Sequence, residues 1–252
     1  MEVVKWWKIL VKEKKMEFRQ DSKIIFSFID KYYNINTYNG KIVKKFFKEL
    51  CKNVFQKNLD IHMRSGLTFP ILYGERTCYS TIGASLHDMG YAHMSEWGIG
   101  IEDKGGNSNE SIYRRVDFWC EKNSRQFWLE FKHFNFYIGS GAKRIYSDDI
   151  FFRVKNKIIG GLKQIQQIKL CEKGYKLAIF NAYLWFHEYK EPKEEMKKIL
   201  ERIVDSFVEI KEVRKEKVLY GVMDFTQCYE KYNFFLNDDR VAYVMMIGMV
   251  YL

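Results

Sequence analysis

The chain has 252 residues, of which 47% are hydrophobic and 17% aromatic, and it contains only two prolines. This length and composition suit one large domain, or a core with a helical annex, and they argue against a disordered chain. The formal net charge of +10 at pH 7 suits a polyanionic partner, although many basic proteins bind none.

The cysteines and the apolar runs indicate the compartment. The five cysteines are widely scattered and form no Cys-x-x-Cys pair, which is typical of reduced thiols and argues against a disulfide framework or a zinc cluster. Lys5, Lys8 and Lys12 interrupt the apolar residues near the start, so we expect no signal peptide. The longest apolar run, 241–252, is too short to span a bilayer. We therefore expect a cytoplasmic protein with no membrane partner.

Residues 2–57 show helical spacing in three segments, and we expect a helical N-terminal region, 1–57, packed on an α/β core that spans 58–252. Asp21 and Ser22 can cap the second segment. The third segment places apolar residues on one face, namely Val43, Phe46, Phe47, Leu50 and Val54.

The opposite face of the third segment carries lysines, namely Lys44, Lys45, Lys48 and Lys52. Two interpretations are open for them. They form either a solvated helix face or a surface that contacts the backbone phosphates of a nucleic acid.

The remaining elements alternate in a way that indicates fold class. Residues 58–90 contain several glycines and a proline and are expected to be irregular. The elements expected after them are a strand near 91–101, a hairpin over 113–133, a helix over 148–170, a strand over 176–186, a helix over 191–207 and strands over 218–225 and 240–251. The order β-β-β-α-β, preceded by helices, predicts an α/β fold with a mixed central sheet flanked by helices.

The hairpin carries ionisable residues where a purely structural strand would avoid them. Because side chains alternate along a strand, Glu130 and Lys132 share one face. The polar turn 121–124 can fold the preceding strand back antiparallel and bring Asp117 beside them. Two carboxylates and an ammonium group on a hydrophobic sheet are costly unless they bind a metal or take part in chemistry.

A plainer interpretation is an edge hairpin with a cross-strand pair of a lysine and an acid on a solvated face. Trp119 and Trp128 should lie on that same face, however, which favours the wall of a cleft. Acid-x-base triplets also arise by chance, and the strongest rival is Glu209-Ile210-Lys211. The near upstream acid of this rival, Asp205, lies in the same helical pattern, so the context favours Glu130.

Asp117 and Glu130-Phe131-Lys132, with a strand–turn–strand–helix order over residues 91–185, resemble the PD-(D/E)XK nuclease superfamily, which has the restriction-endonuclease-like fold. Val116 stands where the name of the family has proline. The resemblance implies a restriction-endonuclease-like core and a metal-dependent nuclease, endonuclease or exonuclease, that hydrolyses phosphodiester bonds in DNA. It leaves RNA open as a substrate.

The resemblance also implies roles for the motif residues. Asp117, Glu130 and the main-chain carbonyl of Phe131 would bind the metal, and their hard oxygen atoms suit Mg²⁺ or Mn²⁺. Lys132 would orient or help to deprotonate the attacking water and would offset charge that develops on the phosphate.

Two further residues complete the expected catalytic set. Many relatives carry an additional acid upstream of the aspartate, and we expect Glu96 in this role, with Glu49 as a weaker alternative. Relatives also project a polar residue from the helix after the motif toward the phosphate, and Gln164 is expected there.

Two functions of other classes stay open. A non-catalytic protein could keep this fold as a nucleic-acid-binding or protein-interaction module. An RNA-binding protein could use the many aromatic residues for base stacking, although most of them lie on apolar stripes that suit a core. The sequence also leaves open whether the protein acts as a homodimer.

Overall fold

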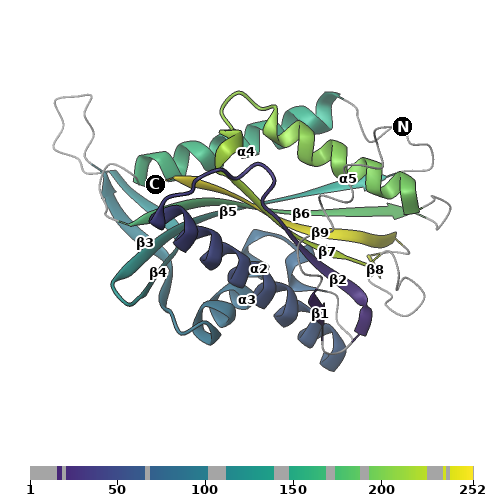
Figure 1. Ribbon diagram of the computed structural model, residues 1–252, viewed down its shortest axis with the longest axis horizontal. Coiled ribbons are helices and arrows are strands. Elements are labelled where there is room, and N and C mark those ends of the chain that lie inside the picture. Colours follow the sequence, from purple (N-terminus) through teal and green to yellow (C-terminus); the bar gives the residue numbers. More distant parts are fainter. Residues whose placement is uncertain are drawn as a thin grey trace.

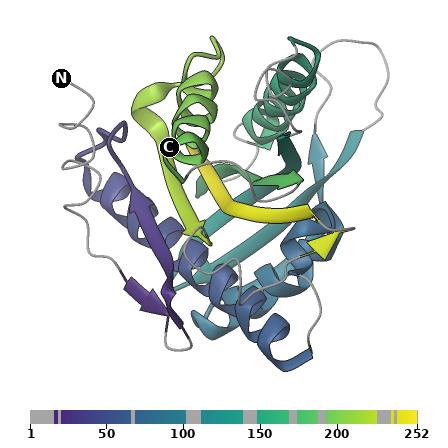
Figure 2. The same ribbon diagram turned by 90° about the vertical axis from the view of Figure 1, so that its right-hand side faces the viewer.

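The structure is a computed structural model that describes residues 16–18, 21–65, 69–101, 112–138, 148–168, 174–187, 193–225, 235–236 and 239–251. These residues form a nine-stranded mixed sheet with helices on both of its faces (Figures 1 and 2). Helices α2 and α3 cover one face, and α4 and α5 cover the other. The expected α/β class with a mixed sheet flanked by helices is confirmed.

The strands are β1 (Met16–Phe18), β2 (Asp21–Ile29), β3 (Ala92–Ile101), β4 (Ile112–Lys122), β5 (Arg125–Ile138), β6 (Tyr175–His187), β7 (Val218–Asp224), β8 (Phe235–Leu236) and β9 (Asp239–Tyr251). The helices are α2 (Tyr38–Ser65), α3 (Glu75–Asp88), α4 (Asp148–Ile168) and α5 (Lys193–Val208), with short 3-10 turns at Pro70–Leu72 and Lys215–Lys217. The strands lie in the order β1-β2-β7-β9-β6-β5-β4-β3, and β8 pairs with β9.

The pairing directions explain where α4 lies. Strands β5 and β6 are parallel, whereas the other pairs in the described sheet are antiparallel. A parallel pair needs a long crossover connection, and α4 lies in the connection between these two strands. The expected strand–turn–strand–helix–strand order over the motif is therefore present.

Helix α2 packs its apolar stripe against the middle of the sheet. Phe47 is fully buried, and a Cβ atom added to Gly248 of β9 would lie 2.7 Å from its ring. Cys51, one turn later, meets Gly221 of β7 in the same way. Both glycines let the helix approach the sheet closely. The five apolar residues expected to be buried on this helix are all buried.

The second predicted helix of the N-terminal region is wrong, because residues 21–29 form β2. This strand pairs antiparallel with β7 and buries Ile24, Phe26 and Phe28 at alternate positions. Tertiary pairing with a central strand outweighs the helix-capping signal of the residues before it. The first predicted helical segment lies outside the described residues, apart from 16–18, which form β1. The domain boundary expected at residue 57 falls inside α2.

The segment 58–90, expected to be irregular, contains the end of α2 and the whole of α3. Helix α3 buries Cys78, Ile82 and Leu86 at a four-residue spacing. Gly83 lies inside this helix and faces β3. A Cβ atom at this position would lie 3.2 Å from the His93 ring, so a larger residue would crowd the strand. The glycine that suggested a loop instead permits close packing of a helix on a strand.

The other predicted elements agree with the structure to within a few residues. The hairpin forms with Asn123 and Ser124 in its turn, both at positive φ, and the helices and strands after it lie where the periodicity placed them. None of the helices in the described ranges combines the length and apolar character needed to cross a bilayer. Cys51, Cys78 and Cys120 are buried free thiols, whereas Cys171 and Cys228 lie outside the described residues.

Candidate functional site

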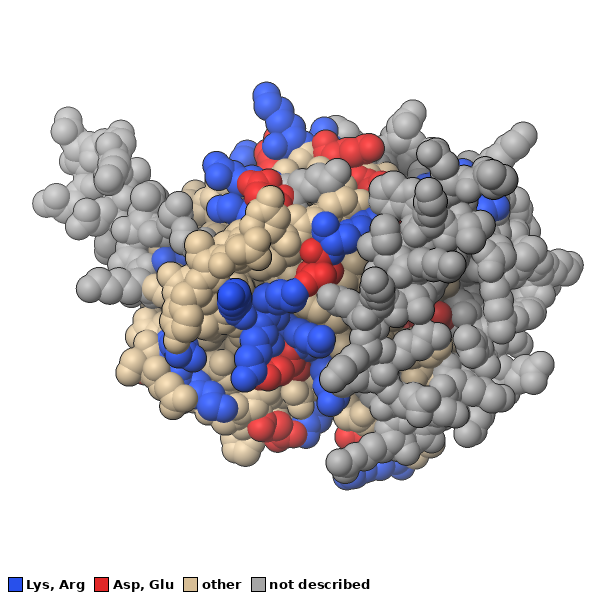
Figure 3. Space-filling model, in the orientation of Figure 1, with Lys and Arg blue, Asp and Glu red and all other residues tan. Residues whose placement is uncertain are grey.

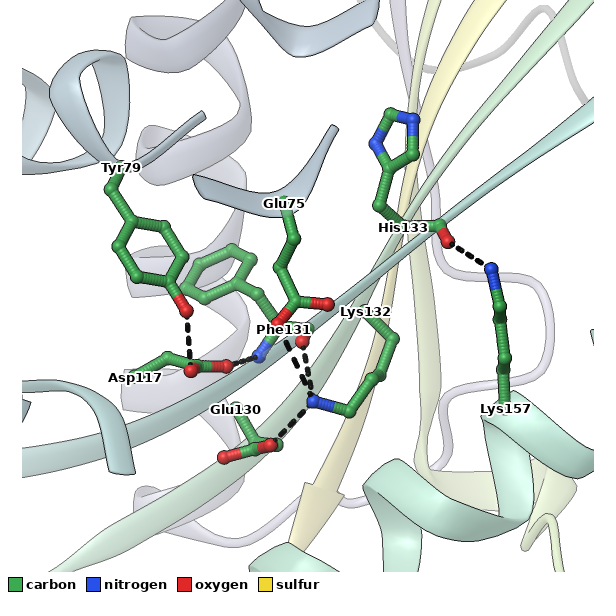
Figure 4. Close-up of polar contacts among 8 residues, drawn as sticks. All are labelled: Glu75, Tyr79, Asp117, Glu130, Phe131, Lys132, His133 and Lys157. Atoms are coloured by element: carbon green, nitrogen blue, oxygen red, sulfur yellow. Dashed lines mark hydrogen bonds and ion pairs between the residues drawn. The ribbon is translucent and has the colours of Figure 1, made fainter. Parts of the chain in front are cut away.

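The candidate site lies where β4 and β5 separate. Their antiparallel pairing runs from Lys122–Arg125 to Phe118–Leu129. At the next position the Asp117 carboxylate takes the place of a backbone acceptor, because the Phe131 amide donates to its Oδ2 at 2.6 Å. The Tyr79 hydroxyl, from α3, donates to Oδ1 at 2.5 Å. Asp117 is thus held from two sides in the opening between the strands (Figure 4).

Glu130 and Lys132 meet beside Asp117, on the side of the sheet that faces α4. The Lys132 ammonium donates to Glu130 Oε1 at 2.6 Å and to the Phe131 carbonyl at 3.0 Å. The Glu130 side chain is only 2% exposed and that of Lys132 18% exposed. Gly161 of α4 leaves room for the lysine, since a Cβ atom there would lie 3.0 Å from Lys132 Cγ.

A third carboxylate, which the sequence did not single out, comes from the first turn of α3. Glu75 Oε1 lies 3.7 Å from the Lys132 ammonium, and the Glu75 side chain is 35% exposed. The Glu75 carboxylate therefore points toward Lys132 from α3 and stays partly exposed to solvent (Figure 4). Its position depends on how α3 packs against the hairpin, so no local pattern around residue 75 marked it.

The electrostatics of the cluster show that its acids are crowded. Burial raises the pKa of Glu130 to about 7; the nearby Asp117 charge adds to this, and Lys132 opposes it. Burial by itself lowers the pKa of Lys132, but Glu130, Asp117 and Glu75 together raise it above the ordinary value. Lys132 is therefore a stable ammonium group that neutralises part of a surplus of negative charge.

The two α3 residues respond to the same crowding. Burial raises the pKa of Glu75, Lys132 opposes this rise, and Asp117 adds to it. Burial also raises the pKa of Tyr79, as does its hydrogen bond to Asp117. Tyr79 is consequently a hydrogen-bond donor that stays protonated and orients the aspartate.

The donor atoms of this cluster suit a hard divalent cation, although they are not arranged as a finished ligand set. Glu130 Oε2 is buried and has no hydrogen-bond partner among the described residues, which is costly for a carboxylate oxygen. No group of three His, Cys, Asp or Glu side chains in the described ranges is already arranged to hold a metal ion. The Lys132 ammonium binds Glu130 Oε1 and the Phe131 carbonyl, two oxygens that the resemblance assigns to the metal.

Glu96 lies on β3 across from Asp117, and its carboxylate pairs with Arg115. The register of β3 and β4, with Ser95 opposite Phe118 and Trp97 opposite Val116, sets Glu96 opposite Asp117. Two carboxylates at such positions repel each other. Glu96 has a φ of 51° and forms an ion pair with Arg115 at 3.2 Å, with its side chain 42% exposed. Its expected role as the upstream acid stays a prediction, and the structure sets Glu75 beside Lys132 instead.

Two other predicted site residues, Gln164 and Glu49, lie on helices. Gln164 is partly buried on α4, three residues beyond the Gly161 that adjoins Lys132. Glu49 is on α2, where its carboxylate lies 3.9 Å from Lys45, as expected of a surface partner.

The rival triplet lies outside any such cluster. Glu209 and Lys211 are both exposed in the turn that follows α5. His133 points away from the acids, as its strand position predicts, and burial lowers its pKa to about 4 (Figure 4).

The lysine stripe on α2 is partly neutralised. Lys45 and Lys52 are exposed, whereas Lys44 forms an ion pair with Asp30. The Lys48 ammonium lies 5.4 Å from the centre of the Phe28 ring. Figure 3 shows basic side chains gathered over the part of this face that α2 covers, with acidic side chains among them. Both interpretations of the stripe, a solvated face or a phosphate contact, remain open.

Comparison of the chain with protein-family models, with curated proteins and with solved structures gave no match. Fold and site define the class as an α/β protein with a partly buried acid–lysine cluster at an opening in its sheet.

Proposed function

We propose that the protein is a divalent-metal-dependent nuclease that hydrolyses phosphodiester bonds in DNA. The observation that carries the proposal is the convergence of Asp117, Glu130 and Lys132 at one point, with Glu75 beside them. An inert hairpin would have no reason to bury a carboxylate whose second oxygen meets no partner in the part of the chain that the structure describes.

Each group has a role that its surroundings support. Asp117, Glu130 and the Phe131 carbonyl would hold Mg²⁺ or Mn²⁺, and Glu75, which faces Lys132, would add negative charge near the ion. The metal, when bound, would supply Lewis acidity toward the phosphate and toward a water molecule. Glu130 would offer Oε2 to the ion, the oxygen without a partner among the described residues, while Lys132 stays on Oε1.

The charge state of Lys132 favours one of its two expected roles. Since the surrounding acids raise its pKa, Lys132 is a donor that orients the water or a phosphate oxygen and offsets developing charge, rather than the base that removes the proton. Tyr79 would keep Asp117 in place throughout.

The test is cleavage of supercoiled plasmid and of single-stranded DNA in Mg²⁺, Mn²⁺ or EDTA. We expect Asp117→Asn and Lys132→Met to reduce cleavage at least about 100-fold. Glu209→Gln and Lys211→Met alter the rival triplet and serve as matched controls that should cleave normally. Cleavage that survives in Asp117→Asn would overturn the proposed mechanism. Cleavage in EDTA would refute the proposed requirement for a divalent metal.

A second candidate is a non-catalytic nucleic-acid-binding module. The observation in its favour is that, within the described ranges, no three side chains are already arranged as metal ligands. Wild-type protein that binds DNA, binds no Mn²⁺ and cleaves nothing would support this candidate.

A further inference from the structure

A row of side chains on β4 continues the site in both directions. Arg115, Asp117 and Trp119 occupy alternate positions and so follow one another along the strand. The Arg115 side chain is 75% exposed. Only one of its guanidinium nitrogens, Nη1, contacts Glu96, which leaves further donors that can face solvent. A cationic group therefore lies on one side of the acid cluster and an aromatic ring on the other.

The aromatic side of this row leads to an exposed apolar surface. The Trp119 ring lies 6.4 Å from that of Trp128, which is buried, and 6.1 Å from that of Trp97, which is 40% exposed. Met94 pairs with Trp119 across the strands and is 44% exposed. We call Met94, Trp97 and Trp119 the tryptophan platform. The platform packs on the buried ring of Trp128, and the ring of Trp97 at its other end is exposed.

The left-handed turn at Glu96 explains why Trp97 reaches this surface. Side chains of a regular strand alternate between faces, which would put Trp97 and Met94 on opposite sides of β3. The φ of 51° at Glu96 interrupts the alternation, and the Trp97 ring packs at 31° to that of Trp119. The conformation of Glu96 thus places the Trp97 ring against Trp119, two residues from Asp117 on β4.

We propose that the tryptophan platform binds an unpaired base of DNA next to the scissile phosphate. This inference rests on the proposed nuclease function and specifies its substrate. A base inside a duplex has neighbours on both of its faces, so only an unpaired or terminal base can stack on an exposed indole. Arg115 to Trp119 spans about 13 Å, which accommodates about four stacked nucleotides with the scissile one near Asp117. The substrate is therefore single-stranded DNA or a duplex with a single-stranded end.

Binding in EDTA tests this without cleavage. Fluorescence anisotropy would be measured with a labelled single-stranded 12-mer, and a covalently closed circular duplex, which has no ends, would be added as unlabelled competitor to measure duplex affinity. We expect Trp97→Ala to weaken binding of the single strand about 5- to 150-fold, the range for loss of one base–aromatic stack. Trp97→Phe should retain most of the affinity, and neither variant should change affinity for the duplex.

Two further variants keep the test decisive. Met94→Glu adds a negative charge to the platform without altering a buried group and should also weaken single-strand binding. Tyr38→Ala removes an exposed aromatic ring on α2 and should change nothing.

Equal single-strand affinity of wild type and Trp97→Ala would overturn the inference. So would a wild-type dimer that Trp97→Ala converts to a monomer in light scattering, since β3 is an edge strand and the platform would then be a self-interface.

The nuclease proposal is tested separately by adding Mg²⁺. If single-strand binding depends on Trp97 but no DNA is cleaved, the nuclease proposal is refuted and the base-stacking proposal stands. If Trp97→Ala cleaves and binds single-stranded DNA as the wild type does, the base-stacking proposal is refuted and the nuclease proposal stands.

Discussion

The two halves of the sheet are built differently. Strands β6, β9 and β7 pair over long, nearly continuous registers, and their buried side chains are mostly apolar. Strands β4 and β5 pair over only five residues each, and the charged cluster occupies the point where they part. The first half contributes most of the buried apolar side chains of the sheet, and the second contains the buried carboxylate of Glu130 and its charged neighbours. Substitutions should therefore separate stability from chemistry.

The largest effect on stability should come from the regular half. Phe47→Ala removes a fully buried ring that packs on Gly248, and we expect the free energy of unfolding to fall by about 3–5 kcal/mol in urea denaturation. Tyr38→Ala, at a 70% exposed position, should change it by less than about 0.5 kcal/mol. A loss below about 1 kcal/mol for Phe47→Ala would mean that α2 does not pack as described.

Substitutions near the cluster between β4 and β5 should change cleavage activity more than stability. Glu75→Gln should reduce cleavage about 10- to 100-fold, because it removes a charge that faces Lys132, while the unfolding free energy changes little. Glu96→Gln is the matched comparison and should stay within about threefold of wild type, because its carboxylate belongs to an exposed pair with Arg115. The reverse order of effects would restore Glu96 as the upstream acid.

The buried charge of Glu130 should make stability depend on pH. Because its pKa is raised to about 7, the folded protein binds the proton more tightly than the unfolded chain between about pH 4.5 and 7. The contribution of Glu130 to stability is thus greatest at low pH and is lost as the pH rises through 7.

We therefore expect the unfolding free energy of wild type, minus that of Glu130→Gln, to fall by about 1–3 kcal/mol between pH 5 and pH 8. His133 acts in the opposite direction, since its lowered pKa destabilises the fold as the pH falls from 6.5 toward 4. The subtraction removes the His133 contribution, which both proteins share. A difference that stays flat with pH would show that Glu130 is ionised throughout.

The smallest effect should follow from Tyr79→Phe. The variant removes one hydrogen bond to Asp117 but leaves the Phe131 amide in place, so we expect a loss of about 1 kcal/mol in stability and less than about tenfold in cleavage. Denaturation and a plasmid-cleavage assay on the same sample would measure both. A loss as large as that of Asp117→Asn would mean that the tyrosine does more than orient the aspartate.

The site hairpin was predictable because its information is local. Asp117, Glu130 and Lys132 lie within sixteen residues on two strands joined by a short turn, so alternation alone assigns their faces. The helices α4 and α5 and the buried β9 also followed from periodicity and apolar content. What alternation did not reveal is the opening between the strands, since it depends on Asp117 replacing a backbone acceptor.

The elements missed were those that tertiary contacts define. The alternation of Ile24, Phe26 and Phe28, with Ile25 between them, was a strand signal, but it competed with the caps before it. Helix α3 carries small and polar residues on its buried side, such as Thr81 and Ser85, so its amphipathic pattern is weak. Glu75 is invisible to sequence reasoning because only the packing of α3 on the hairpin gives it a partner.

The position of β9 has a consequence for synthesis of the protein. This strand, at residues 239–251, lies between β6 and β7, although both precede it in the chain. Until the ribosome has released it, β6 and β7 each present a long open edge of unpaired amide and carbonyl groups, to which other nascent chains can add. We expect the growing polypeptide to depend on chaperones until β9 has been synthesised and has left the ribosome.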